Sequence, residues 1–181
     1  KYCSPECQKE DWKNHKQFCK AIVAEKKRMT EEAKKLTTSE ASTSKEISAA
    51  LSKAAREGDK AMVKKILKKK EGCFDVNRAA KDGCELYSHS PLYEACQNGH
   101  APIVDLFLQQ KGIDVNQVEE IGCTSLYIAC QNFHTPVVDL LLQHNGIDVN
   151  QTEKNGCTPL SVACENGHVP IVDLLLQQND I

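Results

Sequence analysis

Apolar residues in the second half of the chain recur three and four positions apart, which is the spacing of one face of a helix. The pattern occurs twice between residues 122 and 150, first at Leu126 and Ala129. It returns at Val138 and Leu141, after a break of polar residues. Each run is short and keeps polar residues on its other face. The pattern therefore predicts two short amphipathic helices, each with one apolar side to bury.

This helix pair is repeated along the chain with a period of 34 residues, since Gly122 and Cys123 return as Gly156 and Cys157. An alanine followed by a cysteine falls in the same register three times, at Ala95-Cys96, Ala129-Cys130 and Ala163-Cys164. An Asn-Gly-His turn separates the two helices at residues 98–100 and again at 166–168. A unit of this size cannot bury its apolar faces alone, so we expect the units to stack into a solenoid.

The repeated pattern G-x-T-P-L-x-x-A-x-x-x-G-H, followed by an apolar stripe and D-V-N, resembles the ankyrin repeat. The resemblance implies an all-α solenoid in which short hairpin loops project as fingers between successive units. We place its four repeats at 47–82, which is degenerate, and at 83–121, 122–155 and 156–181, the last truncated. An insertion between residues 83 and 91 is either a recognition finger or a tolerated surface loop.

The chain departs from the family at the Thr-Pro-Leu-His motif, whose Thr and His link neighbouring units through hydrogen bonds. The corresponding residues are Ser90 to Tyr93, Thr124 to Tyr127 and Thr158 to Ser161, and no repeat keeps the His. The motif therefore does not predict a polar network between repeats, and we expect apolar stacking to suffice to hold them together.

The first nineteen residues carry a different pattern, in which cysteines and a histidine have the spacing Cys-x3-Cys-x7-His-x3-Cys. Thiolates and imidazole nitrogens are the ligands of tetrahedral structural zinc. The candidate ligands for Zn²⁺ are Cys3, Cys7, His15 and Cys19.

Residues 1–19 resemble the C-terminal half of a MYND-type zinc finger. After it we predict a helix and a Ser/Thr-rich linker at 20–46. The resemblance implies two interleaved zinc sites, each taking two of the four candidate ligands, with further cysteines upstream in the family. It also implies that Gln8 and Trp12 contact proline-containing peptides, although Trp12 could instead pack the core of the finger. We interpret the chain as a fragment of a longer protein at both ends.

Composition narrows the remaining classes of function. The chain is 40% hydrophobic and 27% charged, and no apolar run approaches the roughly 20 residues that cross a bilayer, so we expect no membrane partner. Most of the ten cysteines lie at periodic positions, where a free cysteine acts as a small buried apolar residue. This favours a reducing, intracellular compartment, either cytoplasm or nucleus.

Charge divides the chain into two unlike parts. Residues 1–77 hold 19 Lys and Arg against 12 Asp and Glu, whereas residues 78–181 hold 4 against 13. Lysine clusters such as 68–70 leave an alternative function, a nucleic-acid-associated (transcriptional) regulator that uses the basic N-terminal part, although no aromatic residues interleave with them.

We find no phosphate-binding loop, nucleophile elbow or H-E-x-x-H pair, so the sequence predicts an interaction adaptor rather than an enzyme. In ankyrin proteins, partners lie along the concave face formed by the fingers and the first helices. That face maps to Tyr93, Gln97, Tyr127, Gln131, Ser161 and Glu165. The acidic repeats should bind a basic or amphipathic segment of another protein.

Overall fold

The computed structural model describes residues 44–69, 74–78, 89–119 and 122–178, which belong to one compact unit spanning Ser42–Ile181. In these ranges the chain forms helices and no strand. The helices, in chain order, are α2 (Ser44–Glu57), α3 (Lys60–Lys69), α4 (Pro91–Gln97), α5 (Ala101–Leu108), α6 (Ser125–Gln131), α7 (Thr135–Leu142), α8 (Pro159–Glu165) and α9 (Val169–Leu176).

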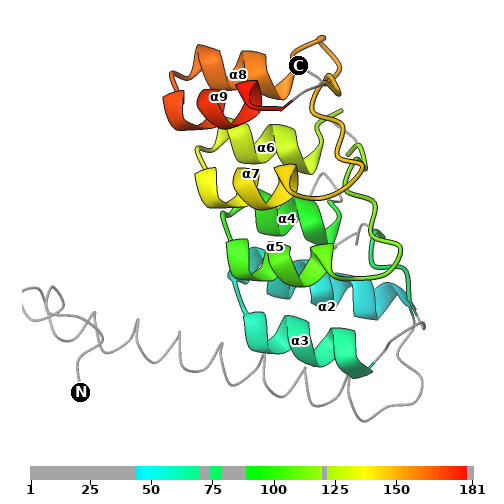
Figure 1. Ribbon diagram of the computed structural model, residues 1–181. Helices are drawn as coiled ribbons and strands as arrows, with labels where there is room; N and C mark the ends of the chain where they lie inside the picture. Colours follow the sequence, from blue (N-terminus) through cyan, green and yellow to red (C-terminus); the bar gives the residue numbers. More distant parts are fainter. Residues whose placement is uncertain (1–43, 70–73, 79–88, 120–121, 179–181) are drawn as a thin grey trace, which may run out of the picture. The chain divides into compact units, whose positions relative to one another are not determined.

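The helices stack as four pairs in two rows (Figure 1). Within one row α2, α4, α6 and α8 contact one another in sequence, and α3, α5, α7 and α9 do the same in the other. The loops that join α5 to α6 and α7 to α8 emerge on the same side of the stack (Figure 1). The structure thus confirms the prediction of an all-α solenoid with projecting loops.

The first helix of each of the last three pairs begins at a hydroxyl residue. The side chains of Ser90, Thr124 and Thr158 accept hydrogen bonds from the backbone N–H three residues later, at 3.3, 3.1 and 3.1 Å. Such a cap satisfies one of the backbone donors that a helix leaves free at its start. The second helices of the same three pairs, α5, α7 and α9, carry a proline in their first turn, where a missing N–H costs nothing. Local sequence therefore determines where each helix begins.

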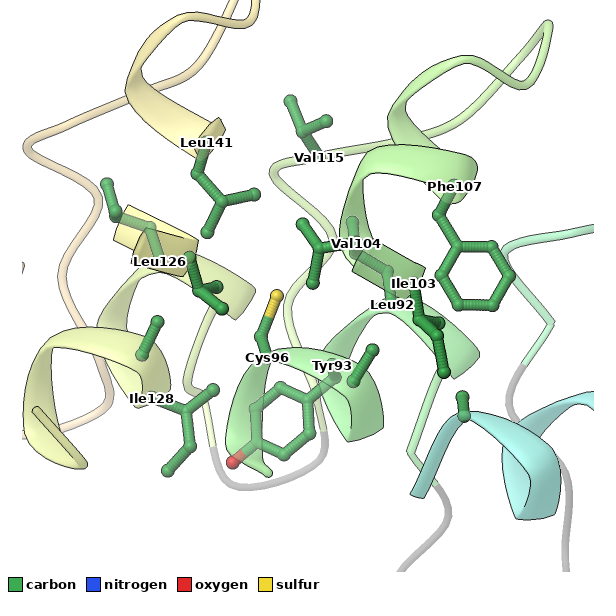
Figure 2. Close-up of a cluster of buried hydrophobic side chains, with 14 of the residues drawn as sticks. Leu92, Tyr93, Cys96, Ile103, Val104, Phe107, Val115, Leu126, Ile128 and Leu141 are labelled. Atoms are coloured by element: carbon green, nitrogen blue, oxygen red, sulfur yellow. The ribbon is translucent and has the colours of Figure 1, made fainter. Parts of the chain in front are cut away.

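Apolar side chains from both rows form one continuous core. Figure 2 shows the core around α4 to α7, where side chains such as Val104 and Leu126 lie between the helices. Leu126 is fully buried, as its periodic position predicts. Its counterpart Leu160, in the last repeat, is only partly buried because α8 is the last helix of its row in the described residues.

Candidate interaction surface

Three of the predicted contact residues occupy the same position in successive repeats. Gln97, Gln131 and Glu165 are the last residues of α4, α6 and α8, and these helices pack side by side. Gln131 and Glu165 are exposed, and Gln97 is partly exposed. Together the three residues form a polar line across three repeats, which we call the Gln-Gln-Glu line.

The two predicted contact tyrosines are buried in the structure. Tyr93 is 1% exposed and Tyr127 is 8% exposed. Burial raises the pKa of Tyr93 well above its usual range and raises the pKa of Tyr127 to about 12. Both side chains join the hydrophobic core, as Figure 2 shows for Tyr93. This corrects the prediction that they face a partner, because a residue buried to this degree has little surface to offer.

Ser161, the counterpart of these tyrosines in the last repeat, uses its hydroxyl within its own helix. Its Oγ accepts a hydrogen bond from the N–H of Thr158 at 2.8 Å and donates to the carbonyl of Thr158 at 2.8 Å. Together with the hydrogen bond that Oγ1 of Thr158 accepts from the N–H of Ser161, this forms a capping box. Ser161 is therefore part of a helix cap in this structure.

A polar network links neighbouring repeats in addition to the apolar stacking, although the family's motif did not predict one. Nε2 of His100 donates to the carbonyl of Arg56, and Nε2 of His134 donates to the carbonyl of Gln97, both at 3.0 Å. His168 also bonds to the preceding repeat, through Nδ1 and to the carbonyl of Cys130 at 2.8 Å, one residue before Gln131, the counterpart of Gln97. The histidines of the Asn-x-His turns thus supply the inter-repeat bonds, although the family's motif histidine is absent.

The asparagines of the Asp-Val-Asn segments add a second ladder at the loops. Nδ2 of Asn77 donates to the carbonyl of Gly112 at 2.8 Å, and its Oδ1 accepts from the N–H of Asp114 at 2.8 Å. Asn116 repeats both bonds one unit later, with Gly146 at 2.7 Å and Asp148 at 2.9 Å. The recurrence of Asn in register was the only sequence signal for this ladder.

A buried ionic cluster joins the first and second helix pairs. Glu94 is 2% exposed and receives Nε and Nη2 of Arg56 at 2.9 and 3.0 Å. Nδ1 of His89 lies 3.2 Å from the same carboxylate. A second buried carboxylate, Glu119, accepts the backbone N–H of Ser90 at 2.9 Å. Sequence patterns did not reveal this cluster, because Arg56 comes from another repeat and His89 lies within the insertion at residues 83–91.

The periodic cysteines divide by their place in the stack. Cys96 and Cys130 are fully buried, and burial raises the pKa of the Cys96 thiol well above its usual range and that of Cys130 to about 12. A thiol in this state stays protonated at neutral pH and acts as a small apolar side chain. Cys164 is exposed, which corrects the expectation that it packs like the other two, because no described helix covers its side of α8.

The candidate zinc ligands Cys3, Cys7, His15 and Cys19, and the candidate peptide contacts Gln8 and Trp12, lie outside the described residues. Among the residues that are described, no group of three or more His, Cys, Asp or Glu is placed to hold a metal ion. None of the described helices is long and apolar enough to span a bilayer.

Comparison with known families agrees with this architecture. The family described as "Ankyrin repeats (3 copies)" matches residues 12–119 and 92–181. The chain belongs to the ankyrin repeat family. The family described as "MYND finger", a zinc-binding domain, matches residues 1–19. A search of curated proteins gave no match. Ankyrin repeats and MYND fingers are typically non-catalytic modules, and together they support a role in protein–protein interaction.

Proposed function

We propose that the ankyrin repeats bind a partner protein along the Gln-Gln-Glu line, and that the bound segment is basic. The observation that carries this proposal is the line itself, because it repeats one polar position, partly exposed at Gln97 and exposed at Gln131 and Glu165, across three stacked units. Side-chain amides and a carboxylate in a row can accept hydrogen bonds from a segment lying across the helices. Tyr93 and Tyr127 support this surface from within the core.

Charge favours a basic partner. From residue 89 to residue 178, leaving out 120–121, the chain holds nine Asp and Glu and two Lys. Neither lysine is on the Gln-Gln-Glu line, since Lys111 and Lys154 both belong to the loops between helix pairs. A negative field of this kind attracts a positively charged segment and raises its rate of encounter.

Two matched triple variants test this site. Changing Gln97, Gln131 and Glu165 together to Ala should weaken binding of a partner protein at least tenfold, about 1.4 kcal/mol. The control changes the exposed glutamines that follow the second helices, Gln109, Gln143 and Gln177, to Ala. Affinity measured by calorimetry should be unchanged in the control. Equal affinities for both variants would contradict the proposed site.

For the N-terminal residues we propose that Cys3, Cys7, His15 and Cys19 are zinc ligands and that Gln8 and Trp12 contact a proline-containing peptide. The match of residues 1–19 to a MYND finger supports this assignment, and the ligand types suit Zn²⁺. The prediction is that the double change Cys7→Ala and His15→Ala lowers the zinc content found by elemental analysis. A variant that keeps all the zinc of the wild-type chain would show that the ligands lie elsewhere.

Nucleic-acid contact through the basic part of the chain is the second candidate. It is supported by α3, where Lys60, Lys64, Lys65 and Lys68 are exposed. Phosphate contacts release counterions, so this binding would weaken steeply as salt rises. The affinity of the chain for a short DNA duplex, measured across salt concentrations, distinguishes nucleic-acid binding from protein binding. The Gln-Gln-Glu line would play no part in nucleic-acid binding.

A further inference from the structure

The turn between α6 and α7 departs from the other turns that join the two helices of a pair. Those turns place a glycine at a positive φ, with Gly58 at 76°, Gly99 at 72° and Gly167 at 70°. In the third pair the same position is Phe133, at a φ of 60°. It is the sole non-glycine residue with a positive φ among the described residues. A side chain strains the backbone in this left-handed region, so this phenylalanine opposes stability.

The phenylalanine also disturbs the link to the next repeat. A Cβ added at Gly99 would lie 2.6 Å from Nδ1 of His134, so glycine there makes room for the histidine of the following unit. Phe133 has a Cβ at the corresponding position, and the following histidine, His168, bonds through Nδ1 instead of Nε2. Phe133 therefore affects both the backbone of the turn and the histidine link.

The ring of Phe133 is not used by the core. It is 50% exposed, and its centroid lies 4.7 Å from that of the His168 ring, with a 38° angle between the planes. The next residue after this histidine, Val169, is 62% exposed. These are two of the four exposed large hydrophobic residues in the described part of the chain. Phe133, His168 and Val169 thus form an edge at two adjacent turns, which we call the turn edge. It presents to solvent an aromatic ring that packs on an imidazole.

Charge around this edge is of one sign. The segments 131–136 and 165–170 contain one charged residue, the exposed Glu165, and no Lys or Arg. Gln131 and Glu165 end α6 and α8 directly before these turns, so the edge continues the Gln-Gln-Glu line. An aromatic face near a carboxylate and an amide suits a guanidinium group, which stacks on rings and donates several hydrogen bonds.

We propose that Phe133, with His168 and Glu165, forms a contact point for an arginine side chain of a basic protein segment. The inference rests on the proposed function, because it extends the partner surface from the Gln-Gln-Glu line onto the turn edge. It identifies Phe133 as the aromatic contact that the buried tyrosines do not supply.

An acetylated hexa-arginine peptide, titrated into the full chain by calorimetry, tests this contact. Phe133→Gly restores the residue found in the other turns and should weaken peptide binding by about threefold or more. Phe133→Leu keeps apolar bulk without an aromatic face and should also weaken it. Val118→Ala changes another exposed apolar residue, 44% exposed, and should leave the affinity unchanged. The thermal midpoint of the Phe133→Gly variant should rise, which excludes loss of folding as the cause of weaker binding.

Wild-type affinity in the Phe133→Gly variant would overturn the proposal. If the triple variant of the Gln-Gln-Glu line binds the peptide weakly while Phe133→Gly binds it normally, the proposed function stands and the Phe133 contact fails. If Phe133→Leu binds as tightly as wild type, the contact is not aromatic and the arginine assignment fails. If neither the triple variant nor Phe133→Gly weakens binding, both proposals are wrong.

Discussion

The thiols of Cys96 and Cys130 make the stability of the repeat stack dependent on alkaline pH. Burial raises the pKa of both thiols above the ordinary value of 9.0. Above about pH 9 the unfolded chain loses these protons while the folded chain keeps them, so the free energy of unfolding falls as pH rises toward 12. Each thiol contributes a loss of at most about 1.4 kcal/mol per pH unit in this window. Below pH 9 the full stability is present.

Urea unfolding at about pH 7 and about pH 10 measures this effect. The wild-type midpoint should fall at the higher pH, and it should fall less in the variant carrying Cys96→Ala and Cys130→Ala. The pKa values of Tyr93 and Tyr127 are also raised by burial, so some alkaline loss should remain in the variant. An equal fall in both proteins would assign the whole effect to the tyrosines.

At the residue scale, the sequence predicted burial better than it predicted exposure. Periodicity identified Leu126, Cys96 and Cys130 as core positions, because an apolar residue at helical spacing has one inward face. It could not separate Tyr93 from a surface tyrosine, since the hydroxyl makes the residue suitable for either place. Nor did it anticipate the burial of Glu94, which depends on a charged partner from the preceding helix pair.

At the scale of the helix pair, the glycine turns predict a contrast between two identical substitutions. Gly99→Ala and Gly167→Ala place a methyl group at nearly the same φ, 72° and 70°. At Gly99 the new Cβ would lie 2.6 Å from the ring of His134, whereas at Gly167 nothing lies within 4 Å. Both should lose about 1 to 2 kcal/mol from left-handed strain. Only Gly99→Ala should lose more, because His134 must move from its bond with Gln97.

The free energies of unfolding of the two variants measure this contrast directly. A third variant, Gly99→Ala with His134→Ala, removes the crowded ring. Compared with His134→Ala alone, it should lose about as much free energy of unfolding as Gly167→Ala loses from the wild-type chain. The prediction is wrong if the two single variants are equally destabilised.

The helix pairs show which parts of the fold are local. Caps at Ser90, Thr124 and Thr158, the prolines of the second helices and the glycine turns are all readable from a few neighbouring residues, so the elements could be predicted. The histidine link could not, because it pairs a side chain with a carbonyl 37 residues away in the case of His134 and Gln97. The effect of Phe133 on His168 was missed for the same reason.

At the scale of the whole molecule, the period of 34 residues was sufficient to predict the architecture. In a solenoid each repeat packs on its neighbours in sequence, so the apolar faces of a single repeat are enough to predict how the repeats stack. The contacts of α2 with α4, α4 with α6 and α6 with α8 follow this rule. The partner surface is less predictable. It depends on which residues at the ends of α4, α6 and α8 remain exposed after stacking, and on one irregular turn.

Nearest-neighbour stacking also predicts how damage at one interface spreads. Arg56→Met removes the cation that pairs with buried Glu94 and leaves His89 as the remaining side-chain partner of its carboxylate among the described residues. Such a change costs about 3–5 kcal/mol, and replacing both partners by apolar residues recovers much of it. Hydrogen exchange should show lost protection in α2, α3 and α4 but little change in α8 and α9, because those helices pack on α6 and α7. The double variant Arg56→Met with Glu94→Met should restore protection in α2. A uniform loss from α2 to α9 would mean that the stack unfolds as a single cooperative unit, in which each interface supports all the others.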